Sequence, residues 1–285
     1  MTRRILLTGA TGYLGSHLAK SLLKDGNAVL AIRRVTSSIG RLGSFSSEIQ
    51  WLNSEKLMAD SLGPIDAIIH TATCYGRKQE SAEEVLSVNT LFPLRLLELA
   101  FRNDVGIFIN SDTSLPQDLN PYSLSKKQFL MWGKFFVKSH PIQFVNVKLE
   151  QVYGAFDDPQ KLTSYIINGC LNNAKELQFT GGVQQRDFIH IDDVVSAYMT
   201  LLRTKEPGFT EFEVGSGQSF SIRYFAETVK SICNSSTRLQ FGAIPYRDGE
   251  IMHSKADITK LMALGWSCRH GLESGLRQVI KMETI

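Results

Sequence analysis

Short apolar runs alternate with amphipathic stretches along the first half of the chain. The runs predict strands at Arg4–Thr8, Ala28–Arg33, Gln50–Leu52, Ala67–His70, Ile107–Ser111 and Phe144–Leu149. Between them, apolar residues three and four positions apart predict helices over Tyr13–Lys24, Ser81–Phe101 and Ser123–His140. Because alternating strands and helices are joined by right-handed crossovers between parallel strands, the pattern predicts an α/β fold with a doubly wound parallel sheet.

The pattern loosens after about Tyr153, where Gly, Gln and Asn become frequent. We therefore expect a first domain over residues 1–152 and a smaller C-terminal lobe over residues 153–285. Within the lobe, the stretch 187–205 has the pattern of a strand followed by a helix, and we expect it to return to the first domain.

Composition narrows the class of protein. The chain has 285 residues, of which 43% are hydrophobic and 21% are charged, which is enough for a large buried core. No apolar run approaches the roughly 18 to 20 residues that a membrane span needs, and the first run stops at Gly9, too early for a signal peptide. The formal net charge of +3 is scattered, without the basic stripe of a nucleic-acid-binding protein. We expect no membrane and no nucleic-acid partner.

The four cysteines are isolated from one another. They form no CxxC pair and no His/Cys cluster with metal-ligand spacing, and they are Cys74, Cys170, Cys233 and Cys268. Isolated cysteines are typical of proteins in a reducing compartment. We therefore expect a cytoplasmic protein with no metal site.

Three glycines follow the first predicted strand and open the first predicted helix. Glycines in this place allow a tight turn and a close approach of the backbone to a pyrophosphate, while the helix N-terminus supplies N–H donors. The spacing is GxxGxxG, and at the first strand of an α/β pattern it indicates a dinucleotide-binding domain of the Rossmann type. The expected cofactor contacts are Gly9, Thr11, Gly12, Tyr13, Leu14 and Gly15.

The end of the second predicted strand indicates which dinucleotide binds. Sites that prefer NAD place an Asp or Glu about 20 residues beyond the glycines, on the ribose hydroxyl. This chain has no acidic residue between Asp25 and Glu48, and the strand ends at Arg33 and Arg34. Two guanidinium groups suit a 2′-phosphate, which a carboxylate would repel. We therefore predict NADPH as the cofactor; the alternative is a solvated pair of surface arginines.

Tyr122 and Lys126 stand four residues apart near the start of the third predicted helix. At this spacing both side chains lie on one helical face. Free tyrosine has a pKa of about 10, too high for efficient proton exchange at neutral pH, and a neighbouring ammonium group would lower it. The pair is therefore a candidate proton donor, and Lys126 is also placed for the nicotinamide ribose. The alternative is a surface contact between two turns of one helix.

Ser111 ends the fifth predicted strand, at the edge where parallel sheets bind ligands. Its hydroxyl is placed to hydrogen-bond a substrate carbonyl oxygen that takes a proton from Tyr122. Thr113 is the rival for this role, although we favour Ser111. For both residues the alternative is capping of the strand end.

Taken together, these motifs resemble the extended short-chain dehydrogenase/reductase family, in its branch that modifies nucleotide sugars. The resemblance extends over almost the whole chain. Beyond the glycines, Ser111, Tyr122 and Lys126, the matching segments are 68–73 (IIHTAT), 88–89 (VN), 149–154 (LEQVYG), 186–194 (RDFIHIDDV), 214–217 (VGSG), 247–250 (RDGE) and 264–266 (LGW).

The resemblance implies further binding residues. In this family the positions of Arg186 and Arg247 commonly hold the pyrophosphate and ribose of a nucleotide-diphosphate sugar, and Gln151 stands where the family usually has a phosphate-binding Asn. A salt link that bridges the domains, with Asp192 or Asp193 as its partner, is the alternative for Arg186, and a loop charge is the alternative for Arg247. The remaining implied contacts are Thr71, Ala72 and Thr73 with the cofactor, and Asp112 and Thr113 with the substrate.

Three reactions are found on scaffolds of this family. Its dehydratases follow the catalytic hydroxyl with Asp and Glu; here Asp112 matches, but Thr113 stands in place of the Glu. Its epimerases hold NAD, which Arg33 and Arg34 disfavour. We therefore expect NADPH-dependent reduction of the C4 keto group of a nucleotide-linked deoxy sugar. The resemblance is to reductases of CDP-4-keto-3,6-dideoxy-D-glucose that serve O-antigen biosynthesis, and the C4 configuration of the product stays open. A 4-epimerase and a non-catalytic dinucleotide-binding regulator are the alternatives.

The resemblance also implies a possible homodimer. Family members often associate through two helices per subunit, and the predicted helices Ser81–Phe101 and Ser123–His140 are the candidates. The alternative for their apolar residues is burial against the sheet.

Overall fold

The computed structural model describes residues 2–53 and 63–284. The chain folds as two compact units. The first contains Met1–Lys148 and Val195–Phe212, and the second contains Leu149–Val194 and Glu213–Ile285. Two segments far apart in sequence thus build each unit, whereas the sequence suggested a division near residue 152 with a single return over residues 187–205.

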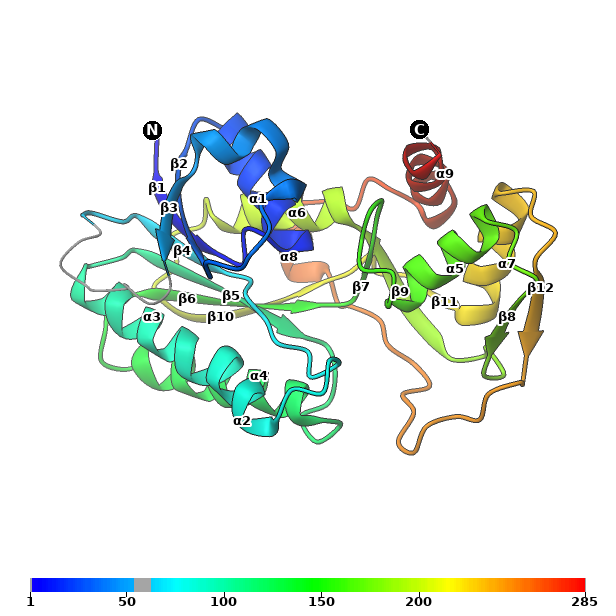
Figure 1. Cartoon of the computed structure of the whole chain (residues 1–285). Coiled ribbons are helices and arrows are strands. Elements are labelled where there is room, and N and C mark those ends of the chain that lie inside the picture. The colour runs from blue at the N-terminus through cyan, green and yellow to red at the C-terminus, as the bar shows by residue number, and fades with distance from the viewer. Residues whose placement is uncertain (1, 54–62, 285) are drawn as a thin grey trace. The chain divides into compact units, whose positions relative to one another are not determined.

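A seven-stranded sheet forms the centre of the first unit (Figure 1). Its strand order is β10-β6-β5-β4-β1-β2-β3, and the pairs β1–β2, β1–β4, β2–β3 and β4–β5 are parallel. The strands are β1 (Arg4–Thr8), β2 (Ala28–Arg33), β3 (Gln50–Asn53), β4 (Ala67–His70), β5 (Ile107–Thr113), β6 (Gln143–Leu149) and β10 (Gly208–Val214). The chain proceeds outward in both directions from β1, so the expectation of a doubly wound α/β fold is confirmed. Ligands of such sheets bind at the carboxyl ends of the strands, near the point where the order reverses.

Helices cover both faces of this sheet. Figure 1 shows α1 (Tyr13–Lys24) and α6 (Ile191–Leu201) on one face, and α3 (Phe92–Arg102) and α4 (Pro121–Phe136) on the other. The residues between the sheet and the second pair of helices are apolar and fully buried, among them Leu97, Phe108, Phe129 and Phe144. The shorter helices of the chain are the 3₁₀ segment Gly40–Glu48, α2 (Ala82–Leu86) and α8 (Thr259–Ala263).

Two elements differ from the predicted ones where chemistry is expected. β5 continues to Thr113, two residues beyond the predicted end. α4 begins at Pro121, because Asn120 caps it by accepting the N–H of Ser123, and the Ser123 hydroxyl accepts the N–H of Asn120 in return. Both changes bring residues of the candidate site into regular elements.

The predicted helix Ser81–Phe101 is interrupted. It begins with α2, passes through a π-helical turn at Ser87–Leu91, and continues as α3. Pro93 is the second residue after the turn, where it lacks the N–H that an uninterrupted helix would use. Single π-helical turns are frequent at functional sites.

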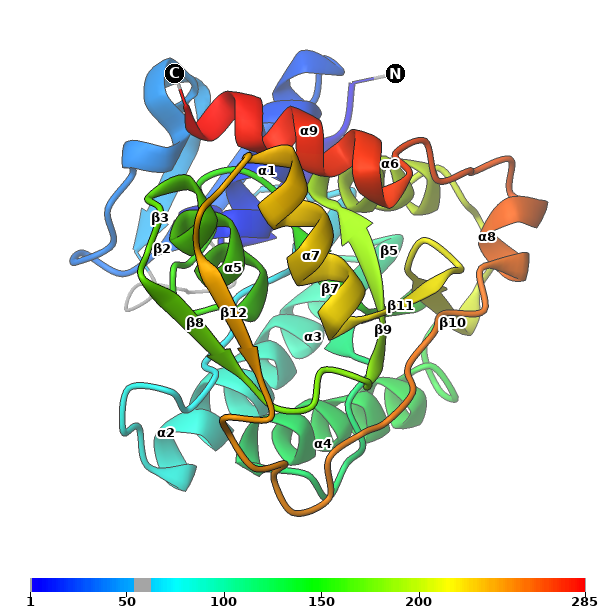
Figure 2. The same ribbon diagram turned by 90° about the vertical axis from the view of Figure 1, so that its right-hand side faces the viewer.

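The second unit contains two small sheets, three longer helices and the short helix α8 (Figure 2). One sheet has the order β11-β9-β7, and the other pairs β12 with β8. The strands are β7 (Gln151–Tyr153), β8 (Glu176–Phe179), β9 (Gln185–His190), β11 (Ser219–Ser221) and β12 (Arg238–Phe241). The helices α5 (Leu162–Leu171), α7 (Ile222–Ile232) and α9 (Leu272–Glu283) pack around an apolar core that includes Phe179, Phe188 and Phe225.

The stretch 187–205 is divided between the two units, and the prediction that all of it returns to the first domain is wrong for its strand. β9 pairs with β7 and β11 inside the second unit, and only Val195 onward belongs to the first. The pattern of β9 indicated a strand but not the strands that it pairs with, because β7 precedes it and β11 follows it in the sequence. Among the helices that the structure describes, none is long and apolar enough to cross a membrane.

Candidate active site

The glycine-rich turn between β1 and α1 is closely packed. Gly9 has a φ of 72°, and a Cβ there would lie 2.6 Å from the Thr71 hydroxyl and 2.7 Å from the Ala72 amide nitrogen. A Cβ on Gly15 would overlap the carbonyl oxygen of Gly9. Gly12 is the N-cap residue of α1, and no side chain caps this helix. The first amides of α1 are therefore uncovered by a capping side chain, which fits the binding of a pyrophosphate.

The other residues predicted to touch a cofactor flank this turn. Thr11, Tyr13 and Leu14 lie within it or in the first turn of α1, and Thr73 follows β4; all four are partly exposed. The packing of the glycines against the turn after β4 brings the two predicted cofactor segments together.

Hydrogen bonds from β1 hold the turn after β4. The Thr8 hydroxyl lies 2.8 Å from Nδ1 of His70 and accepts the N–H groups of Thr71 at 3.2 Å and Ala72 at 3.3 Å. Burial, with a smaller effect of the Lys126 charge, lowers the pKa of His70 well below its ordinary value. His70 is therefore neutral at physiological pH and serves as a structural residue.

Three arginines lie at the end of β2 or in the segment that follows it. The Arg33 guanidinium stacks on the Trp51 ring at 4.8 Å from its centroid, and Arg34 is exposed. The Arg41 guanidinium lies 5.5 Å from the centroid of the Tyr13 ring, at the start of α1. This end of the sheet is therefore cationic, as binding of a 2′-phosphate would require. Arg41 is an addition to the predicted pair.

Asn89 connects the segment after β4 to α4. Its side-chain amide accepts the N–H of Cys74 at 2.8 Å, and it donates to the Cys74 carbonyl at 2.8 Å and to the Ser125 hydroxyl at 3.0 Å. The π-helical turn places Asn89 between these two segments. The segment that follows the cofactor-binding turn is thereby fixed against the helix that carries Tyr122.

Lys126 is buried and donates a hydrogen bond to the carbonyl oxygen of Ser111 at 3.0 Å. Burial lowers the pKa of Lys126 to about 8. Loss of hydration raises the pKa of Tyr122 above its ordinary value, and the proximity of Tyr75 adds to this, while a hydrogen bond with the Thr113 side chain acts in the opposite direction. Lys126 is not among the groups that shift this pKa, so the expectation that it lowers the pKa of Tyr122 stays a prediction.

The two rival hydroxyls have different partners. Ser111 and Thr113 point to the same side of β5, because side chains alternate along a strand. The Ser111 hydroxyl lies 2.6 Å from the Tyr198 hydroxyl of α6, and both residues are buried. The Thr113 hydroxyl accepts the N–H of Leu115 at 3.2 Å, so the strand-end capping considered as its alternative is present, and its side chain lies close enough to Tyr122 to lower the pKa of that phenol. The geometry favours Thr113 as the hydroxyl that works with Tyr122, whereas the sequence favoured Ser111.

An exposed aromatic residue borders Tyr122. The rings of Tyr75 and Tyr122 have centroids 5.1 Å apart, and the Arg77 guanidinium lies 5.0 Å from the Tyr75 centroid. Tyr75 is 44% exposed. No sequence motif indicated Tyr75 and Arg77. Their closeness to Tyr122 depends on how the segment after β4 folds.

Asp112 lies on the opposite side of β5 from its neighbours. Its carboxylate is fully buried, lies 2.8 Å from Nζ of Lys127, and accepts a bond from the Asn146 amide at 3.0 Å. It also accepts the N–H of Thr113 at 2.7 Å. Both oxygens of the Asp112 carboxylate thus accept bonds from protein groups, and the predicted contact of Asp112 with substrate has no support in this geometry.

The second unit holds the predicted nucleotide-binding residues. Arg186 on β9 forms an ion pair with Glu250, with 2.6 Å between Nη2 and Oε1. The Glu250 amide donates to the Arg247 carbonyl at 3.1 Å, so Glu250 connects the turn of Arg247 to Arg186. Gln151 and Arg247 are exposed. Arg186 thus forms a salt link, but with Glu250 of the same unit, and not the domain-bridging link with Asp192 or Asp193 considered as its alternative.

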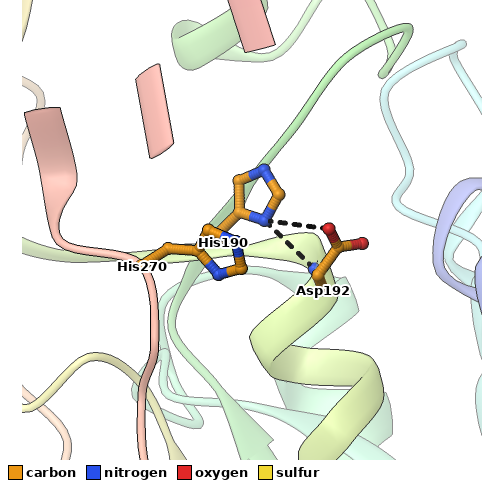
Figure 3. A group of neighbouring side chains, drawn as sticks. All are labelled: His190, Asp192 and His270. Carbon is orange, nitrogen blue, oxygen red and sulfur yellow. Dashed lines mark hydrogen bonds and ion pairs between the residues drawn. The ribbon is translucent and has the colours of Figure 1, made fainter. Parts of the chain in front are cut away.

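A group of His190, Asp192 and His270 also lies in the second unit (Figure 3). Their potential metal-binding atoms lie within 4.8 Å of one another. Nδ1 of His190 accepts the N–H of Asp192 at 3.3 Å, and Nδ1 of His270 lies 3.0 Å from the Asp193 carboxylate. These bonds join the start of α6 to the segment before α9, which accounts for the group as a structural junction. The absence of a metal site stays a prediction.

Comparisons with known proteins define the class. A family model described as the NAD dependent epimerase/dehydratase family matches residues 5–215. The chain belongs to this family, and the resemblance found in the sequence is confirmed.

Relatives and solved structures extend the comparison over the whole chain. The chain is 36% identical over 294 residues to a CDP-abequose synthase of Salmonella muenchen, covering 99% of both chains. It is 24% identical to a putative UDP-glucose 4-epimerase of Methanocaldococcus jannaschii, covering 97% of both. The UDP-glucuronic acid 4-epimerase of Bacillus cereus, solved with UDP-glucuronic acid and NAD, superimposes with a TM-score of 0.85 at 26% identity, covering 99% of both chains.

Proposed function

We propose that this chain catalyses the NADPH-dependent reduction of the C4 keto group of a nucleotide-linked deoxy sugar. Its substrate would be CDP-4-keto-3,6-dideoxy-D-glucose and its product CDP-abequose, a precursor of an O-antigen sugar in lipopolysaccharide. The observation that carries the proposal is the 36% identity to CDP-abequose synthases along the whole chain. The Thr113–Tyr122 contact supports it, because a carbonyl reductase needs a proton donor at the end of the sheet.

The chain's own residues would act on the carbonyl oxygen of the sugar. Bound NADPH would supply the hydride. Tyr122 donates its proton to the oxygen, and its raised pKa keeps it protonated until negative charge develops there. Thr113 hydrogen-bonds the same oxygen and Tyr122. Lys126, held by the Ser111 carbonyl, contributes a buried positive charge near these groups and bonds the nicotinamide ribose.

NADPH rather than NADH is proposed from the residues around β2. The packed glycines and the uncapped start of α1 fit a dinucleotide pyrophosphate. Arg33, Arg34 and Arg41 would surround the 2′-phosphate, where a carboxylate is missing from the sequence. Gly9–Gly15 and Thr71–Thr73 would supply the remaining contacts.

The nucleotide of the substrate would bind the second unit. Arg186 and Arg247 would pair with the diphosphate, and Gln151 would add a side-chain amide. Glu250 holds Arg186 in the structure, so it would have to share the guanidinium with the incoming phosphate.

A dehydratase is disfavoured on either choice of hydroxyl. If Thr113 acts with Tyr122, the next residues are Ser114 and Leu115, so neither of the acids found in the family's dehydratases follows it. A 4-epimerase is the competing function, and the similarity to 4-epimerase structures favours it. An alternative reductase would give CDP-paratose, with the opposite configuration at C4.

We further propose a cytoplasmic homodimer that associates through α4. Met131, Trp132 and Phe135 on this helix are 66%, 43% and 60% exposed. Apolar side chains exposed together on one helix are typical of an interface.

Stoichiometry tests the proposed function. The protein is incubated with NADPH and a panel of 4-keto nucleotide sugars, and absorbance and product are followed together. A reductase consumes one NADPH per sugar reduced and prefers the CDP-linked substrate. Interconversion of 4-epimers without net NADPH consumption would replace the proposal with an epimerase.

A further inference from the structure

The backbone of Thr113 is held from both sides by charged groups. Oδ1 of Asp112 accepts its N–H at 2.7 Å, and Nζ of Lys127 donates to its carbonyl oxygen at 2.8 Å. The same Nζ lies 2.8 Å from Oδ2 of Asp112. Lys127 therefore connects both ends of this arrangement and reaches it from α4, the helix that carries Tyr122.

The carboxylate at the centre is fully satisfied. Its side chain is 0% exposed, and that of Lys127 is 15% exposed. Asn146 on β6 donates one amide hydrogen to Asp112 at 3.0 Å and the other to Glu211 on β10 at 2.9 Å, while Asn110 donates to the Asn146 oxygen at 2.8 Å. The arrangement is thus fixed by three strands and one helix.

Stability alone does not account for such a group. A buried ion pair is often no more stabilising than apolar residues of the same volume, because both charges lose their hydration. Its bonds are directional, however, and here two of them end on the backbone of Thr113, whose side chain lies beside Tyr122. A misplacement of about 1 Å at a reacting group can reduce a rate by about 10²-fold.

We propose that Lys127 is a positioning residue, which together with Asp112 clamps the backbone of Thr113 and so fixes the position of its side chain beside Tyr122. Lys127 does not touch the substrate; it acts through Thr113. This inference rests on the proposed function only in assigning Thr113 and Tyr122 to the carbonyl oxygen.

The test compares three substitutions of lysine. Lys127→Met removes both bonds, Lys127→Arg keeps two donors, and Lys138→Met removes an exposed lysine beyond α4 as the matched control. We expect Lys127→Met to lower kcat about 30-fold while the Kd of NADPH changes less than about threefold. Lys127→Arg should recover most of kcat, and Lys138→Met should match the wild type. Equal kcat in all variants, or failure of arginine to rescue a folded protein, would overturn the proposal.

Loss of the buried partner of Asp112 also costs stability, so a second measurement separates position from folding. Thr113→Val is combined with Lys127→Met at a temperature where both variants are folded. If Lys127 acts through Thr113, the valine substitution costs much less in the Lys127→Met background than in the wild type. If the kcat loss of the double variant equals the product of the two single losses, Lys127 does not act through Thr113.

A measurement that needs no substrate tests the Lys127 clamp separately from the proposed reductase activity. Hydrogen exchange at the Thr113 amide should accelerate in Lys127→Met and be restored in Lys127→Arg. If the wild type reduces no keto sugar, the proposed function fails while this exchange still reports the clamp. Unchanged exchange in Lys127→Met would reject the clamp whatever the reaction.

Discussion

Removal of the Thr113 hydroxyl and removal of the Ser111 hydroxyl should have different effects. The first should lower mainly the catalytic rate, and the second should lower mainly the stability. Thr113→Val deletes the hydroxyl that lies beside Tyr122 and leaves a side chain of nearly the same shape. Loss of one donor to a developing oxyanion costs about 10²–10³-fold in kcat, or about 2.7–4 kcal/mol of transition-state stabilisation. Stability should fall by about 0.5–1.5 kcal/mol, the usual net contribution of one hydrogen bond, because the Thr113 hydroxyl also accepts the N–H of Leu115 at 3.2 Å.

Ser111→Ala should act on stability instead of rate. It leaves the Tyr198 hydroxyl, which lies 2.6 Å from Ser111, buried without that partner. An unsatisfied buried hydroxyl costs about 1–3 kcal/mol, and each kcal/mol lowers Tm by about 2–4 °C in a protein of this size. Residual kcat at a permissive temperature should stay near that of the wild type.

The assay is NADPH oxidation with saturating keto sugar, together with thermal unfolding of each variant. Thr113→Ser is the matched control, since it keeps the hydroxyl and should keep most of kcat. A hundredfold loss of kcat in a stable Ser111→Ala, with Thr113→Val near the wild type, would refute the assignment of the two residues.

Three further predictions follow from the same site. Arg33→Ala should raise the KM for NADPH about 10-fold or more, because one charge-assisted bond to a phosphate contributes about 1.5–3 kcal/mol. The KM for NADH should not change. Equal effects on both cofactors would contradict a role at the 2′-phosphate. Burial lowers the pKa of Lys126 to about 8, so the lysine loses its charge above that pH. The value of kcat/KM should therefore be level below about pH 8 and fall above it. A profile that stays level to pH 10 would show that the free enzyme does not need this charge. Met131→Lys combined with Phe135→Lys should give a monomer by light scattering without loss of kcat per chain, and an unchanged mass would exclude this face of α4 from the interface.

Periodicity was sufficient to predict most elements of the first unit. β1, β2 and β4 have the bounds that the apolar runs indicate, because each is a continuous buried run that ends at a polar residue. β5 extends further than predicted because Asp112 and Thr113 are polar yet buried, held by Lys127 and Asn146. A pattern based on hydrophobicity ends a strand where polar residues begin.

Residues of the candidate site were predictable where a local motif carries the geometry. The glycine turn and the Tyr122–Lys126 spacing belong to this kind. The partner of Ser111 was not predictable, because Tyr198 lies 87 positions away on a helix that returns from beyond the second unit's strands. The contact between Tyr75 and Tyr122 was not predictable for a related reason, since it depends on packing that spacing along a helix does not define.

The most direct test of the proposed reaction uses NADPH that carries deuterium in the transferable position of the nicotinamide ring. The protein is incubated with this cofactor and CDP-4-keto-3,6-dideoxy-D-glucose, and the product is examined by NMR. The proposal predicts one deuterium at C4, one NADP⁺ per product, and the C4 configuration of CDP-abequose. A C4 epimer mixture without deuterium would contradict reduction altogether, and a labelled product with the configuration of CDP-paratose would contradict the proposed product.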